Sequence, residues 1–218
     1  FPRAIQQASK PKQVAYSLFL PIALFIWILP LLAVFLTSVR GAKDINTGNV
    51  FGWPSEFKFV ENYTAVFMQT EAVKYFFNSF LITLPAVAIS IALACLAGYA
   101  LAIYRFRLAL PLFFLFVAGN FVPFQILMVP VRDMSVQTGL YNTIAGQFLF
   151  HAAFQTGFCT LFMRNFIKAL PFDLIESARV EGVAEWRIFW YIIVPLVRPA
   201  IAALAVLIFT FVWNDFFS

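Results

Sequence analysis

Residues 173–199 read DLIESARVEGVAEWRIFWYIIVPLVRP and form the most charge-rich interval of an otherwise apolar chain. The charged members are Asp173, Glu176, Arg179, Glu181, Glu185, Arg187 and Arg198. Each such side chain would cost roughly 2.5 to 3.5 kcal/mol at the centre of a bilayer. We therefore expect the interval to lie in water or on a partner protein, between two membrane spans.

The composition predicts an all-α fold, a polytopic bundle of membrane helices. The chain is 62% hydrophobic and only 11% charged, whereas about a quarter of a soluble domain is charged. Cys95 and Cys159 both lie in apolar runs, far apart in sequence, so the chain has neither a disulfide framework nor a metal-ligand spacing. We interpret both cysteines as small packing residues and expect no metal site.

Uncharged runs long enough to cross a bilayer, which takes about 20 helical residues, predict five spans. They lie at residues 14–39, 75–104, 108–131, 140–163 and 188–213, after a cytoplasmic segment at 1–13. An external loop at 40–74, with a short amphipathic helix near 60–68, and a charged loop at 164–198 separate them. The chain begins at Phe1 without a signal-peptide pattern and is still membrane-like at its end, so we expect further sequence beyond it.

The basic residues predict which side of the membrane each loop faces. Ten of the 15 Lys and Arg residues fall in the N-terminal segment, the loop after the second span and the 164–198 loop: Arg3, Lys10, Lys12, Arg105, Arg107, Arg164, Lys168, Arg179, Arg187 and Arg198. The positive-inside rule places that side in the cytoplasm. Topology thus explains the net charge of +5 without a nucleic-acid partner.

Polar side chains within the spans mark a candidate translocation path. Asn120 and Gln125 interrupt the third span, whose glycine and prolines suit a helix lining a cavity or, alternatively, a kinked packing helix. Gln147, His151 and Gln155 share one face of the fourth span, and Asn214 follows the fifth. With no carboxylate or second histidine beside His151, we favour hydrogen bonding between helices over a proton relay.

A stripe of small residues predicts where two helices approach closely. Ser90, Ala94, Gly98 and Ala102 recur at every fourth position of the second span. Such a stripe is a packing face.

The charged interval itself predicts two helices at the membrane surface. Asp173 can cap the first helix, with Glu176 completing a capping box, and Gly182 ends it. A second helix begins near Ala184 and carries Glu185 in water. We expect the first helix to expose Ile175 and Ala178; the alternative is a solvated surface helix without a partner.

Those residues resemble a known family. Glu176-Ser177-Ala178, Gly182 and the Ile193-Val194-Pro195-Leu196 run resemble the EAA loop of permease subunits from ATP-binding-cassette importers. Further similarity to the carbohydrate branch, close to the maltose-type second permease, lies in Asn78-Ser79, residues 98–102, Pro130, residues 139–142, Pro171 and residues 213–216. The resemblance covers nearly the whole chain from Val14 onward.

The resemblance implies the type I importer transmembrane fold, a sixth span after Trp213-Asn214, and a coupling helix that docks in a cleft of an ATPase subunit. The implied coupling residues are Asp173, Glu176, Ser177, Ala178, Arg179 and Gly182. Ser177 stands in place of the usual second alanine, and Glu181 stands where aspartate is common, so the fit to the cleft can differ.

The implied partners are a second permease subunit in a heterodimer, two ATPase subunits that bind ATP and Mg, and an external solute-binding protein. The implied location is the bacterial cytoplasmic membrane, with the N-terminus in the cytoplasm. The chain itself has no Gly-x-x-x-x-Gly-Lys-Ser/Thr loop, so we expect no catalytic residue and no cofactor in it.

Two other functions stay open from the residues. One is an importer of a non-sugar solute, although the neutral path residues favour hydroxyl-rich ligands. The other is an ATP-independent secondary transporter or channel, which predicts paired ionisable groups at mid-membrane.

Overall fold

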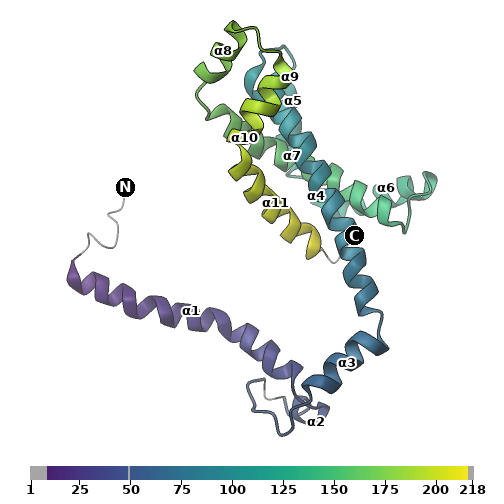
Figure 1. Cartoon of the computed structure of the whole chain (residues 1–218). Helices are drawn as coiled ribbons and strands as arrows, with labels where there is room; N and C mark the ends of the chain where they lie inside the picture. Colours follow the sequence, from purple (N-terminus) through teal and green to yellow (C-terminus); the bar gives the residue numbers. More distant parts are fainter. Residues whose placement is uncertain (1–8, 49, 216–218) are drawn as a thin grey trace. The chain divides into compact units, whose positions relative to one another are not determined.

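The computed structural model describes residues 9–48 and 50–215, and every regular element in those ranges is a helix (Figure 1). This agrees with the predicted all-α class. The chain divides into two compact units, Phe1–Val73 and Lys74–Ser218. Each unit is described by itself.

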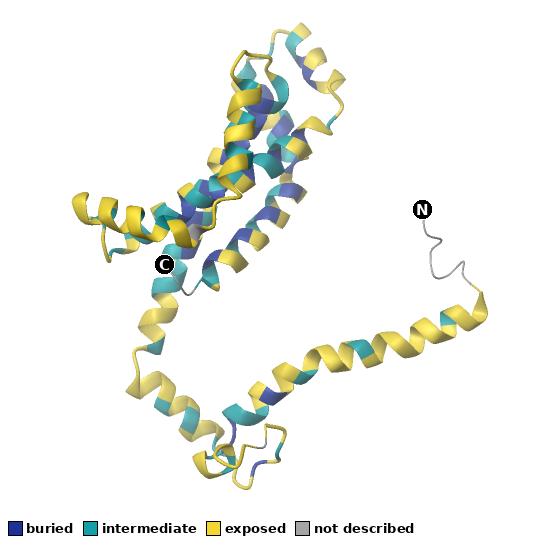
Figure 2. Ribbon diagram, turned by 180° about the vertical axis from the view of Figure 1, so that it is seen from behind, coloured by how far each residue is buried: buried dark blue, intermediate teal, exposed yellow. Residues whose placement is uncertain are grey.

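The first unit is built on one long apolar helix, α1 (Lys10–Ser38), which continues through Pro21 and Pro30. Of its residues only Ala33 is buried, and Figure 2 shows the helix exposed along almost all its length. A helix that is apolar on every side needs lipid or protein around it. Its composition and length suit a membrane span.

Two short helices, α2 (Ala42–Ile45) and α3 (Phe59–Gln69), form the predicted external loop. α3 confirms the helix expected near residues 60–68. Asn62 Nδ2 donates to the carbonyls of Ser38 and Arg40 at 3.0 and 2.8 Å, which satisfies acceptors at the end of α1. The Asp44 carboxylate accepts hydrogen bonds from the Ser55 amide and hydroxyl, and these lower the pKa of Asp44.

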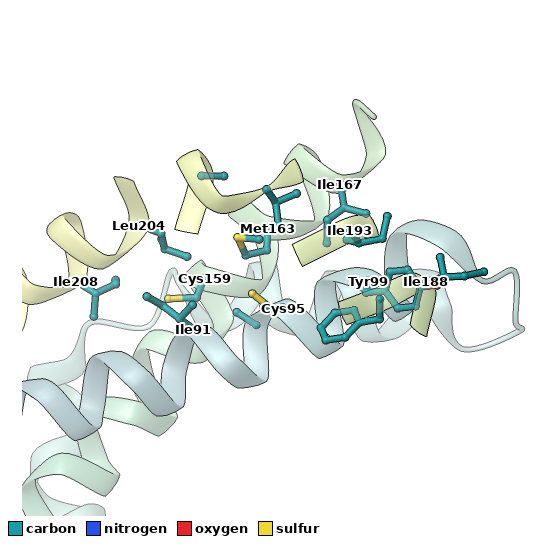
Figure 3. Packing of buried hydrophobic residues seen from close by; sticks show 14 of the residues in the cluster. Ile91, Cys95, Tyr99, Cys159, Met163, Ile167, Ile188, Ile193, Leu204 and Ile208 are labelled. Atoms are coloured by element: carbon teal, nitrogen blue, oxygen red, sulfur yellow. The ribbon is translucent and has the colours of Figure 1, made fainter. Parts of the chain in front are cut away.

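The second unit is a bundle around α4, α7 and α11. Its elements are α4 (Ala72–Ile103), α5 (Ala109–Gly119), α6 (Phe124–Gln137), α7 (Ile144–Lys168), α8 (Asp173–Val180), α9 (Glu185–Arg187), the π-helix η2 (Ile188–Ile193), α10 (Val194–Leu196) and α11 (Arg198–Trp213). Figure 3 shows Ile91, Cys95 and Tyr99 of α4 against Cys159, Met163 and Ile167 of α7. Both cysteines are buried in this cluster, as their interpretation as packing residues requires.

The small-residue stripe of α4 packs directly against α7. The Ser90 hydroxyl donates to the carbonyl of Ala152 at 3.3 Å, and Arg164 Nε donates to that of Leu101 at 3.4 Å. A Cβ on Gly98 would lie 2.9 Å from the backbone nitrogen of Arg164. Ser90, Ala94 and Gly98 are buried, and Ala102 is half-buried. Because glycine carries only a hydrogen in place of a Cβ, the backbones of α4 and α7 can approach each other closely at position 98.

The predicted third span is divided into two helices. α5 ends at Gly119, and α6 begins at Phe124 after a break that contains Pro123. Proline disfavours the helical region in the residue before it, which accounts for the interruption. By length and composition α1 and α4 each suit a membrane crossing, and the bent pair of α9–α10 with α11 makes a third if it is one span. The assignment of five spans stays a prediction.

The last helical stretch is bent, as its prolines predict. The helix axis turns by 71° between Glu185–Leu196 and Arg198–Trp213. Pro195 and Pro199 flank this turn and lack the N–H that would complete a helical hydrogen bond. The π-helical segment η2 precedes the bend and is separated from it by α10, and sequence patterns did not predict it.

We predict that Gly98→Val destabilises the second unit by about 1–3 kcal/mol, because the new side chain overpacks the contact between α4 and α7. Thermal unfolding of the detergent-purified protein measures the loss. Gly119→Ala is the matched control, since no heavy atom lies within 4 Å of its Cβ position. Equal melting temperatures for the two variants would contradict close packing at Gly98.

Candidate functional site

Helix α8 has one face turned into the protein and one face turned out. Ile175 and Ala178 are 1% and 7% exposed and belong to the same core cluster as Ile188 and Phe189. The expectation that α8 exposes Ile175 and Ala178 is therefore wrong. Spacing of three residues places both on one face, and that face packs on the chain itself rather than on a partner.

The outward face of α8 carries three of the predicted coupling residues, whereas Arg179 is half-buried and Gly182 follows the end of the helix. Asp173, Glu176 and Ser177 are exposed, and Val180 is 84% exposed. The Ser177 hydroxyl donates to the carbonyl of Leu174 at 3.2 Å, within the helix. An exposed valine flanked by carboxylates on one helical face suits a protein contact, and the coupling role of these residues stays a prediction.

The predicted capping box at the start of α8 is absent from the described contacts of this helix. The N-cap position is Phe172, with no side-chain cap hydrogen bond, and its dihedrals are already helical at φ −62° and ψ −30°. A capping side chain requires an extended backbone at the N-cap. Asp173 lies one position after the N-cap and so cannot act as the cap. Its carboxylate in the first turn still stabilises the helix through the helix dipole.

Gly182 ends the α8 segment as predicted. Its φ of +77° is a conformation that side chains with a Cβ disfavour. The Val183 amide donates back to the carbonyl of Ala178 at 3.0 Å, and the Gly182 amide donates to that of Arg179 at 3.0 Å. This pattern is a helix-terminating turn. It sends the chain directly into α9, close to the predicted start at Ala184.

Glu185, expected to lie in water, is partly exposed and also binds three side chains. Arg179 Nε donates to Oε1 at 2.6 Å and Arg179 Nη2 donates to Oε2 at 3.2 Å. The hydroxyls of Tyr99 and Tyr104 donate to Oε2 at 2.8 and 2.7 Å. We call Arg179, Glu185, Tyr99 and Tyr104 the carboxylate clamp.

The aromatic rings of the clamp also pack against their neighbours. Tyr99 and Tyr104 meet edge to face at 5.7 Å, and Tyr99 lies 5.2 Å from Phe189. The Arg179 guanidinium lies 5.7 Å from the centre of the Tyr104 ring, and its hydrogen bond to Glu185 raises the pKa of Arg179. The clamp joins α8, α9 and the end of α4 through charge-assisted hydrogen bonds. Sequence reasoning missed it because the partners are up to 86 positions apart.

A small polar cavity lies near the start of α7, away from the end that leads into α8. It has a volume of about 120 Å³ and is lined by Ser79, Ile82, Thr83, Gln147, His151, Val212, Trp213 and Asp215. His151 Nε2 lies 3.5 Å from Asp215 Oδ2, and both side chains are nearly fully buried. The expectation that His151 has no carboxylate beside it is therefore wrong. Asp215 was overlooked because it follows the end of the last apolar run.

A second cavity, of about 520 Å³, lies between α6 and the start of α7. Its polar lining comes from Arg132, Ser135, Tyr141, Asn142, Thr143 and Gln147, and its volume is typical of ligand pockets. Gln147 lines both cavities. Sequence reasoning found Gln147 and missed the rest, because only the fold brings α6 over the start of α7.

The other predicted path residues are not gathered at these cavities. Asn120 and Asn214 are exposed and donate to carbonyls of their own helices, those of Phe116 and Thr210, each at 2.7 Å. Gln125 is exposed on α6. Gln155 is buried, and within the described residues its Nε2 finds no hydrogen-bond partner. Their part in a path stays a prediction. No group of three or more metal-ligating residues occurs in the described part of the chain.

We predict that Ile175→Ala weakens the seating of α8 by about 2–5 kcal/mol, because truncating a buried isoleucine leaves a cavity. Hydrogen exchange of the α8 amides should accelerate. Val180→Ala is the control, and on an exposed position it should change stability by no more than about 0.5 kcal/mol. Unchanged exchange in the Ile175 variant would contradict the burial of this face.

Comparison with known proteins gives one family and a consistent set of relatives. Residues 70–218 match the family described as "Binding-protein-dependent transport system inner membrane component". An osmoprotective compounds uptake permease protein of Synechocystis is 41% identical over 88% of this chain and 66% of the relative. A diacetylchitobiose uptake system permease protein of Streptomyces coelicolor is 30% identical over 88% and 65%. The chain thus spans slightly less than two thirds of the length of these two relatives.

A third relative and one solved structure agree with them. A lactose transport system permease protein of Rhizobium radiobacter is 32% identical over 94% of this chain and 73% of the relative. The crystal structure of a bacterial ABC transporter for the import of the acidic polysaccharide alginate has a chain with a TM-score of 0.81. That match covers 96% of this chain and 74% of the other at 22% identity, and it supports the predicted type I importer fold. On these matches, the chain belongs to the family of inner membrane components of binding-protein-dependent transport systems, and it is an integral membrane protein.

Proposed function

We propose that this chain is the permease subunit of an ATP-driven importer that takes up a sugar, an oligosaccharide or a sugar derivative delivered by an external binding protein. The observation that carries the proposal is the two-faced helix α8, whose inner face is fixed in the permease core while its outer face is free for a partner. Family membership supports the same conclusion.

The partner for the outer face of α8 is an ATPase subunit in the cytoplasm. Glu176, Ser177 and Val180 supply acidic, polar and apolar contacts on one exposed surface. The assembly would contain a second permease, forming a heterodimer, and two ATPases that bind ATP and Mg. Closure of the ATPases would move α8 and switch the bundle between inward and outward access, so that no nucleotide chemistry is needed in this chain.

The solute is hydroxyl-rich on two grounds. Two relatives are named for the saccharides lactose and diacetylchitobiose. The cavities at the start of α7 offer amide, hydroxyl, imidazole and carboxylate groups, which together can donate to and accept from sugar hydroxyls. The larger cavity would be the entry for part of the solute, with Gln147 at its junction to the smaller one.

The charge distribution supports an orientation with the N-terminus and the α8 loop in the cytoplasm, in the cytoplasmic membrane of a bacterium. Ten of 15 basic residues lie on that side, as the positive-inside rule requires. The external loop with α2 and α3 then faces the solute-binding protein.

One observation favours a second candidate, an ion-coupled transporter that works without ATP. The buried pair His151 and Asp215 is the kind of ionisable pair that such proteins place in their pathway. The family match weighs against this candidate. Solute uptake into vesicles by the chain alone, without ATP, would support it.

Purification of the complex from native membranes tests the proposed function. We expect an ATPase, a second permease and a binding protein to accompany the chain, and the ligand retained by the binding protein to identify the solute. A chain that purifies alone and moves solute without ATP would overturn the proposal.

We predict that Glu176→Lys abolishes solute uptake and the stimulation of ATPase activity by loaded binding protein, because it reverses a charge on the docking face. The subunit should still insert, since the side chain is exposed. Reconstituted complexes with and without the substitution provide the measurement. Normal uptake by the variant would show that Glu176 is not part of the coupling surface.

We predict that Gln147→Leu raises the solute concentration for half-maximal uptake by about tenfold, the effect of losing one hydrogen bond worth about 1.4 kcal/mol. Maximal ATPase activity should stay within twofold of wild type in the same proteoliposomes. Gln137→Leu, on the exposed end of α6, is the matched control. Equal shifts in both variants would exclude Gln147 from the path.

A further inference from the structure

The carboxylate clamp ties the loop that carries α8 to a membrane helix. Glu185 receives two hydrogen bonds from Arg179 of α8 and one from Tyr99, which lies within α4. Tyr104, just beyond the end of α4, supplies the fourth. Both oxygens of the carboxylate are therefore used, and all four donors point at a single side chain.

The clamp differs in kind from the apolar seating of α8. Ile175 and Ala178 exclude water and hold the inner face of α8 in the core, but the hydrophobic effect that favours their burial is non-directional. Hydrogen bonds to a carboxylate are directional, and the paired bonds from a guanidinium fix its plane as well. The clamp thus adds directional bonds between α8, α9 and α4 to the apolar packing of the core cluster.

Helix α4 connects the clamp with the polar cavity. It is helical from Ala72 to Ile103, continuing through Pro85, with Tyr99 near one end and Ser79 and Thr83 towards the other. At 1.5 Å per residue, the 16 positions from Thr83 to Tyr99 span roughly 24 Å. A displacement imposed on Tyr99 along or about the helix axis is therefore carried to the wall of the cavity that holds His151 and Asp215.

We propose that Glu185 is a positioning residue that links the coupling helix α8 to α4, so that ATPase closure is transmitted to the solute pathway. The inference rests on the proposed function and deepens it, because it names the contact through which motion leaves α8. Glu176 and its neighbours serve docking on the outside, and Glu185 serves transmission on the inside. Loss of the clamp leaves docking intact and separates ATP hydrolysis from uptake.

The test measures the ATP hydrolysed per solute imported by the complete complex in proteoliposomes. Glu185→Gln cannot pair with Arg179 as an anion, and we expect the ratio to rise at least about fivefold, the lower end of typical coupling effects. ATPase subunits should still co-purify. Asp133→Asn, an exposed carboxylate on α6, is the control for loss of one charge, and its ratio should match wild type.

Two further sets of variants distinguish a loss of coupling from misfolding of the subunit. Tyr99→Phe with Tyr104→Phe removes two donors and keeps both rings, and it should raise the ratio by a smaller factor. Arg179→Glu alone should uncouple, whereas Arg179→Glu combined with Glu185→Arg restores an ion pair and should recover part of the coupling. A purely stabilising ion pair would also be restored by charge exchange, so the ratio is compared among variants whose complexes have the same yield and melting temperature as wild type; a raised ratio at unchanged stability is not expected of a side chain that only stabilises the fold.

The outcomes separate this inference from the proposed function. A wild-type ratio in both Glu185→Gln and the tyrosine variant overturns the inference while the proposed function stands. Loss of the assembled complex in the tyrosine variant also overturns it, because the clamp would then serve assembly alone. Absence of any ATP-dependent uptake by the wild-type complex overturns the proposed function itself.

Discussion

The close approach of α4 and α7 is the constraint on which the second unit depends. Gly98 lies so near the backbone of α7 that a Cβ would reach the amide of Arg164. That proximity brings Ser90 to the carbonyl of Ala152 and Leu101 to the Arg164 guanidinium. In a membrane, where lipid offers no hydrophobic drive for helices to associate, small residues and such hydrogen bonds supply the packing. This contact lies between the clamp residue Tyr99 and the cavity residues Ser79 and Thr83 along α4.

The two ends of the bundle carry different chemistry. At one end, acidic and basic groups form the carboxylate clamp beside an exposed helix face. At the other end, amide, hydroxyl, imidazole and carboxylate groups surround two cavities. α4 and α7 run through both ends. A permease needs such a separation, because the energy source and the solute are met on opposite sides of the membrane and must be connected by stiff elements.

Sequence patterns predicted the features that depend on local spacing. The helical class, the stripe at Ser90 to Gly98, the turn at Gly182 and the bend near Pro195 all follow from periodicity or from backbone preferences of glycine and proline. The direction in which α8 faces was predicted wrongly, since a short helix with charges and aliphatic residues is consistent with either orientation. Contacts over long sequence distances, between Tyr99 and Glu185 or between His151 and Asp215, leave no local signal. Only the three-dimensional structure reveals these contacts.

The two cysteines add a practical consequence. Cys95 and Cys159 are the chain's whole complement of thiols, and both are buried at the contact between α4 and α7. An alkylating reagent can reach them only when those helices separate, so native thiol reactivity reports the opening of the bundle without any engineered label. In the proposed importer complex, comparing the labelling rate without nucleotide and with trapped ATP would show whether the two helices move apart or move together as one rigid body.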